Sequence, residues 1–297
     1  RELFPLSLAE LSQTKRPVVQ EVLSCNQASQ IRDLLNDLAF SHHKSLAMAR
    51  VRESLEHLLT WGGMPALLAL EDSEHKWIWI EEYCQTYLQR DLSDLGRVAD
   101  LDDFFRLQRL AAMRSAGVLN YADLARDADL SAITAKKYMQ YLTLSYQAFL
   151  LPSFRRRAKE RLIKAPRLHW MDIGVQRVLS GVRTGLTGPQ FETAMVSEFY
   201  KLCRTLRLEA ELMYLRTKDG REVDLITGLP NGGYVAWEIK AADRATPFDA
   251  RHLRGLSSYL DGPLLAGIVV YQGDDILSWE NDLFAVPAHV LFGELGT

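Results

Sequence analysis

Two short apolar runs that each carry an acidic residue constrain the fold of this chain more than any other feature. The first run contains Asp224, and the second contains Glu238 followed by Lys240. Side chains at i and i+2 of a strand point to the same face, so Glu238 and Lys240 are expected to share one face. A turn at residues 228–233 separates the runs, and a hairpin would bring Asp224 alongside. The sequence therefore predicts two carboxylates and an ammonium group at one point.

This combination of side chains is what divalent-metal phosphodiester hydrolysis requires. Asp224 and Glu238 are the candidate catalytic and metal-ligating residues, because carboxylate oxygens suit Mg²⁺ or Mn²⁺. Lys240 is the candidate for orienting the attacking water or stabilising a phosphoryl oxygen. A helix carboxylate commonly completes such a site, and Glu192 is preferred for it, with Glu198 as the alternative. The competing interpretation is a set of solvated residues on an exposed strand face.

The composition sets limits on the class of protein. Apolar residues make up 47% and charged residues 25% of the 297 residues, and the net charge of −3 gives no global nucleic-acid signature. The three cysteines stand apart, so we expect neither a disulfide framework nor a thiolate zinc site. Isolated cysteines indicate a reducing, cytoplasmic compartment. No apolar run is long enough to span a bilayer, so no membrane partner is expected.

Three regions with different periodicity follow one another along the chain. Residues 21–98 carry apolar side chains at helical spacing and are expected to form a helical, lid-like subdomain. Residues 99–180 alternate short helices with strands. Residues 188–297 mix helices and strands, which predicts an α/β layer arrangement and makes the whole chain a multidomain α+β protein. The expected elements of this last region are helix 191–208, strands 211–216, 222–227 and 234–240, helix 248–260 and strand 264–271.

The middle region has the outline of a winged helix. A helix at 103–115 and a short helix at 121–126 precede a third helix that Ser131 opens as N-cap. A short helix, a turn and a longer helix are typical of the helix-turn-helix. Strands at 146–154 and 168–171 would flank a basic wing.

A local positive patch in this winged helix predicts contact with the DNA backbone. The alternative is a basic, solvated hairpin in a domain that only couples proteins. The candidate nucleic-acid-binding residues are Lys136 and Lys137 on the third helix and Arg155, Arg156, Arg157, Lys159, Arg161 and Lys164 in the wing.

The acidic pair and lysine after a glutamate-bearing helix resemble the PD-(D/E)xK nuclease superfamily. More of the chain resembles the C-terminal part of bacterial and archaeal AAA-type ATPases that end in a nuclease-like domain of unknown function. The matching segments are Glu2-Leu3, Pro5-Leu6-Ser7 and Glu10, then Gly62-Gly63-Met64-Pro65, Lys164-Ala165-Pro166-Arg167, Asp172-Ile173-Gly174, Phe191-Glu192, residues 222–224 and residues 238–240.

The resemblance implies that residues 1–20 are the tail of an ATPase core lying upstream of Arg1, which would hold the ATP. The chain has no Gly-x-x-x-x-Gly-Lys-[Ser/Thr] motif, so this region is not expected to hydrolyse ATP. It also has Ala66 where the family usually has glutamate. The expected partners are DNA, the ATPase core and other subunits, with oligomers in view.

Two functions follow from these expectations. One is Mg²⁺- or Mn²⁺-dependent cleavage of DNA by the domain at 188–297, with a winged helix at 99–180. The other is a non-catalytic module that binds nucleic acid or protein and is driven by the ATPase core.

Overall fold

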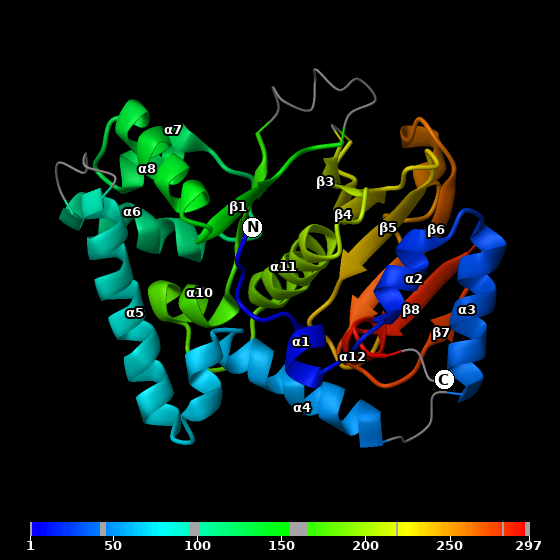
Figure 1. Cartoon of the computed structure of the whole chain (residues 1–297). Helices are drawn as coiled ribbons and strands as arrows, with labels where there is room; N and C mark the ends of the chain where they lie inside the picture. Colours follow the sequence, from blue (N-terminus) through cyan, green and yellow to red (C-terminus); the bar gives the residue numbers. More distant parts are fainter. Residues whose placement is uncertain are drawn as a thin grey trace. The chain divides into compact units, whose positions relative to one another are not determined.

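The computed structural model describes residues 2–41, 46–94, 101–154, 165–217, 219–280 and 282–294. It confirms a mixed architecture of helices with a mixed six-stranded sheet (Figure 1). The chain divides into two compact units, and each is assembled from separate stretches of sequence. Unit 1 comprises Arg1–Leu6, His57–Leu151 and Ala165–Ser197, and unit 2 comprises Ser7–Glu56, Pro152–Lys164 and Glu198–Thr297.

Unit 1 is mainly helical. Its core gathers side chains from several helices, and Phe104, Leu107 and Trp170 are fully buried. The helices expected near residues 103–115 and 121–126, and the one opened by Ser131, are all present. Its elements are η1 (Pro65–Ala69), α5 (Ser73–Asp94), α6 (Leu101–Met113), α7 (Tyr121–Asp127), α8 (Ala132–Leu144), β1 (Ala148–Leu151), β2 (Arg167–Trp170) and α10 (Ile173–Ser180).

Side-chain caps explain where the short helices of unit 1 begin. Asn120 caps α7 by accepting from the N–H groups of Ala122 and Asp123, and Ser131 caps α8 by accepting from the N–H of Thr134. Each cap satisfies N–H groups that have no partner inside the helix. After α8 the chain enters β1, which pairs antiparallel with β2.

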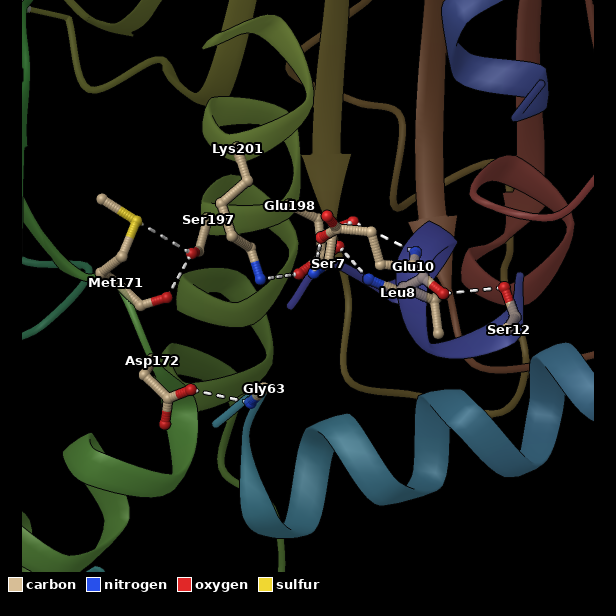
Figure 2. A network of polar contacts seen from close by, with 10 residues as sticks. All are labelled: Ser7, Leu8, Glu10, Ser12, Gly63, Met171, Asp172, Ser197, Glu198 and Lys201. Carbon is tan, nitrogen blue, oxygen red and sulfur yellow. Dashed lines mark hydrogen bonds and ion pairs between the residues drawn. The ribbon is translucent and has the colours of Figure 1, made fainter. Parts of the chain in front are cut away.

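Three of the segments singled out by resemblance meet at one joint of unit 1. Asp172 accepts the N–H of Gly63 at 2.7 Å through Oδ2 (Figure 2). Its Oδ1 caps α10 by accepting the N–H of Val175. The carbonyl of Gly63 in turn accepts the N–H of Leu6 at 2.7 Å. Gly174 packs closely on the backbone of Trp61, and a Cβ at Gly174 would lie 1.9 Å from the Trp61 carbonyl oxygen. These segments therefore form a structural joint.

We expect Gly174→Ala to destabilise unit 1 by more than about 3 kcal/mol, because the new methyl group overlaps a backbone oxygen that cannot step aside. Gly181→Ala is the matched control. Gly181 has φ 74° and nothing within 4 Å of its ideal Cβ, so it should lose only about 1 kcal/mol from backbone strain. Urea unfolding measures both values, and an equal loss in the two variants would contradict the close packing at Gly174.

Unit 2 is built around the six-stranded sheet, whose strand order is β3-β4-β5-β6-β8-β7. β3, β4 and β5 form an antiparallel meander, and β6 pairs parallel with β5 and with β8. The strands are β3 (Glu211–Arg216), β4 (Glu222–Gly228), β5 (Tyr234–Ile239), β6 (Leu264–Tyr271), β7 (Leu277–Ser278) and β8 (Leu283–Pro287).

Helices from the start of the chain also belong to unit 2. Helix α3 contacts β6, and the N–H of Val18 in α2 donates to the carbonyl of Gly293. These helices bury Val18, Val22, Ile31 and Leu35 completely. The elements are α1 (Leu8–Ser12), α2 (Val18–Ser24), α3 (Ala28–Ser41) and α12 (Ala288–Leu291), while α4 (Leu46–Trp61) and α11 (Gly188–Thr205) each continue across a boundary between the units in sequence.

The alternation of β5 shows which of its residues face which side of the sheet. Trp237 packs on Phe199 of α11, with ring centroids 4.7 Å apart. Tyr234 and Ala236 belong instead to the core on the opposite face, together with Leu253 and Leu256. Glu238 follows the parity of Tyr234 and Ala236, so it lies on the face opposite α11.

The segment after β5 differs from expectation. Residues 248–260 were expected to be one helix, but they form successive turns followed by η2 (Leu256–Tyr259). Gly255 interrupts the segment with φ 68°, a left-handed conformation that a continuous helix cannot contain.

No helix among the residues placed by the structure is long and apolar enough to cross a membrane.

Candidate functional site

The two acidic residues come together where β4 and β5 separate. The last paired residues of the β4–β5 ladder are Leu225 and Trp237. Beyond them the carboxylate of Asp224 accepts the N–H of Ile239 at 2.9 Å, in place of a backbone carbonyl. β5 continues beside β6, where Glu238 pairs with Val269. Asp224 thus ends one ladder with its side chain and places its carboxylate next to Glu238.

Lys240 completes this group of three residues. Its Nζ lies 2.9 Å from Glu238 Oε2 and 4.0 Å from Asp224 Oδ2. The Glu238 side chain is 3% exposed, while that of Lys240 is 31% exposed and opens the group to solvent. The structure therefore brings together Asp224, Glu238 and Lys240 as the strand parity predicted.

Burial and neighbouring charges set the pKa of Glu238 apart from that of an ordinary carboxyl group. Burial, together with the charge of Asp224, raises the pKa of Glu238 to about 8, and Lys240 acts in the opposite direction. Burial alone would lower the pKa of Lys240, but the charges of Glu238 and Asp224 outweigh it, so its pKa is raised. The Asp224 carboxyl also lies within hydrogen-bonding reach of Glu238. Glu238 and Asp224 therefore form a close pair of carboxyl groups beside Lys240.

This pKa predicts a pH dependence of stability. A carboxyl whose folded pKa is raised contributes stability below its ordinary pKa of 4.5, and that stability is lost as the pH rises through about 8. We expect the urea midpoint of the wild type to fall across this window and to fall less in Glu238→Gln. Equal pH profiles for the two proteins would contradict a raised pKa at Glu238.

The structure places the two helix glutamates in ion pairs with other side chains. Glu192 lies in unit 1, where it accepts from the buried Arg167 at 2.8 Å. Glu198 lies in unit 2, where it pairs with the buried Lys201 and accepts the N–H of Leu8 at 2.6 Å (Figure 2). No group of three or more His, Cys, Asp or Glu side chains suited to a metal is found within the described ranges.

The basic residues predicted to contact nucleic acid are placed only in part. Lys136 is exposed on α8, and Nζ of Lys137 lies 5.7 Å from the centre of the Tyr141 ring. The wing residues fall outside the described residues: Arg155, Arg156, Arg157, Lys159, Arg161 and Lys164.

Residues near the acidic pair that sequence reasoning missed come from the turns after β5. His252 Nδ1 accepts the N–H of Glu222 at 3.2 Å, two residues before Asp224. Its pKa is lowered, first by burial and then by the charges of Arg251, Arg221 and Lys240. The signal in the sequence was the basic run 251–254, which the expectation of a continuous helix did not connect to the site.

Two family models match the chain, one on each side of residue 186. A domain of unknown function (DUF8612) matches residues 52–185, and another (DUF4143) matches residues 187–291. The second is often found at the C-terminus of AAA ATPases, which supports an ATPase-associated region.

The relatives found by sequence are similar over about three quarters of this chain. They are the uncharacterized proteins Rv2008c of Mycobacterium tuberculosis and Mb2031c of Mycobacterium bovis, each 26% identical over 230 residues. The match covers 76% of this chain and 51% of each relative, so the chain spans about half of their length.

One solved structure matches weakly. It is an assembly of Thermococcus gammatolerans McrB AAA+ hexamers with bound McrC. The TM-score is 0.25 and the identity 12%, with 60% of this chain and 46% of that chain covered.

Proposed function

We propose that the chain is the C-terminal region of an AAA-type ATPase, whose PD-(D/E)xK-like domain at 188–297 cleaves DNA in the presence of Mg²⁺ or Mn²⁺. The observation that carries the proposal is the convergence of Asp224, Glu238 and Lys240 where β4 leaves β5. The order of elements supports it: helix α11, the meander β3-β4-β5, a crossover of turns, and β6 parallel to β5.

Two of the residues present, Asp224 and Glu238, offer oxygen ligands suited to one divalent cation. Glu238 Oε1 is buried and has no hydrogen-bond partner among the described residues, although the Asp224 carboxyl lies close by. Two such oxygens are ligands that Mg²⁺ and Mn²⁺ prefer. With Glu192 and Glu198 each held in an ion pair, the remaining positions would fall to water and substrate phosphate.

The roles of the side chains follow from their positions. Asp224 and Glu238 would hold the cation, which supplies charge neutralisation at the phosphate and a lowered pKa for a bound water. Lys240, half-exposed beside them, would orient the attacking water or donate to a phosphoryl oxygen. Because the Lys240 pKa is raised, this side chain acts as a charged donor.

The other parts of the chain would deliver the substrate. Helices α6, α7 and α8 with β1 and β2 would form a winged helix that binds the DNA backbone, with Lys136 exposed on α8. The ATPase core that would bind ATP, and further subunits of an oligomer, would couple to it. The site would act in the cytoplasm.

A non-catalytic role is the second candidate, and the engaged helix glutamates favour it. Without a third carboxylate, the same fold could bind nucleic acid or protein as a regulatory module driven by ATP. Supercoiled plasmid incubated with Mn²⁺, and with EDTA as control, separates the two. Nicking that depends on Mn²⁺ is the expected result. DNA binding without any nicking would contradict the enzyme and favour the regulatory module.

A further inference from the structure

The turns that follow β5 are fastened to the beginning of β4. His252 accepts the backbone N–H of Glu222, and the Arg221 guanidinium donates to the carbonyls of His252 and, at 2.7 Å, of Arg254. Arg221 also lies over the Tyr259 ring, 5.1 Å from its centre. Since Glu222 precedes Asp224 by two residues, these contacts hold the turns beside the acidic pair.

Arg251 on these turns lies beside an exposed aromatic ring. Arg251 is exposed, and its guanidinium lies over the Phe248 ring at 4.5 Å. No ion pair or hydrogen bond of this guanidinium occurs among the residues that the structure describes. The guanidinium of Arg251 is thus a cation at the surface of these turns.

Phe248 adds an aromatic surface to this charge. The Phe248 side chain is 67% exposed, so its ring is accessible from solvent. A guanidinium that lies over a ring contacts the ring with its flat face. The N–H groups in the plane of the guanidinium then remain available for a phosphate. An aromatic ring beside a cation is the arrangement on which unpaired bases stack. In a duplex, by contrast, the faces of the bases are already covered.

We propose that Arg251 and Phe248 bind the phosphate and the base of an unpaired DNA strand, so that the Asp224–Glu238–Lys240 site takes single-stranded DNA or unpaired ends. The strand would pass over the turn 248–251 and bring a phosphodiester group to Lys240. This inference rests on the proposed function for its catalytic meaning, but the binding surface can be tested without cleavage.

The test is fluorescence anisotropy with a labelled oligo-dT strand and a blunt duplex of equal length, in low salt with EDTA. We expect the wild-type chain to prefer the single strand, and Arg251→Ala and Phe248→Ala each to weaken its binding about tenfold. Arg251→Ala should also reduce the slope of log K against log salt by about 0.7, the value for one lost phosphate contact. Arg251→Lys should keep that slope.

Arg204→Ala is the matched control, because Arg204 is also exposed and lies over an aromatic ring, that of Tyr200 at 5.6 Å. Its binding should stay within about twofold of the wild type. The inference is overturned if Arg251→Ala binds as tightly as Arg204→Ala, or if the wild type prefers the duplex or binds neither DNA. Loss of binding in the two turn variants without any cleavage by the wild type would support the strand surface and refute the catalytic proposal.

Discussion

Replacing Lys240 with methionine is expected to reduce Mn²⁺-dependent nicking of plasmid by about 10²- to 10³-fold, because it removes the donor aimed at developing charge. Methionine keeps most of the length of the lysine side chain, so packing around Glu238 changes little. The variant also removes the cation that lowers the pKa of Glu238, so that this carboxyl holds its proton to still higher pH. Initial rates of nicking over a range of pH values measure both effects.

Lys15→Met is the matched control for this experiment, since Lys15 is an exposed lysine of unit 2. It should nick at the wild-type rate. Glu238→Gln should lose as much activity as Lys240→Met if the carboxylate holds the cation. Full activity in either site variant, with the fold intact by circular dichroism, would refute the proposed roles.

The second large effect concerns stability. Lys201→Met should lower the free energy of unfolding by about 3–5 kcal/mol, because it leaves Glu198 with an uncompensated charge at 2% exposure. Glu198 also accepts the N–H of Leu8, so the loss is expected to loosen the start of α1 (Figure 2). Urea unfolding followed by tryptophan fluorescence gives the free energy.

The double variant Glu198→Gln with Lys201→Met separates charge from packing. Glutamine can still accept the Leu8 N–H, and no buried charge remains, so the double variant should be more stable than Lys201→Met alone. Lys15→Met should change the free energy by less than about 0.5 kcal/mol. If the double variant is less stable than Lys201→Met, then Lys201 does not stabilise the fold through its ion pair with Glu198.

Strand parity made the acidic group predictable. The alternation Trp237, Glu238, Ile239 and Lys240 fixes which side chains share a face as soon as the segment is a strand, and β5 confirms that strand. The predicted meander of β3, β4 and β5 and the buried strand β6 were also confirmed. These strands could be predicted because their apolar runs are short and lie between turn residues.

Partner choice could not be predicted in the same way. Glu192 and Glu198 lie on one helix, and either can be drawn toward a site by periodicity alone. Their ion pairs with Arg167 and Lys201 depend on packing that a sequence pattern does not specify. The turn cluster of Arg221 and His252 was missed for a related reason, since it joins residues 30 positions apart through backbone groups.

The glycine pair at residues 62–63 has a structural role in unit 1. Gly62-Gly63 is similar in composition to a nucleotide-binding loop, yet the N–H of Gly63 donates to Asp172 and its carbonyl accepts the N–H of Leu6. A Cβ at Gly62 would lie 2.2 Å from Asp172 Oδ1. The end of α4 and the N-cap residue of α10, Asp172, meet at Gly63, and their backbones must approach closely. Both glycines and the aspartate are explained by that joint.

Unit 2 takes its residues from three stretches of the chain, Ser7–Glu56, Pro152–Lys164 and Glu198–Thr297, and the sheet lies in the last of them. A shortened gene that starts at residue 188 would therefore express the acidic strands without the helices that cover β6 and hold Gly293. The apolar side chains of β6 that α3 contacts would then meet water, and such a product should aggregate. Expression of the acidic site by itself therefore also requires residues 7–56 and the stretch that carries Phe154, on the same polypeptide or as co-expressed chains.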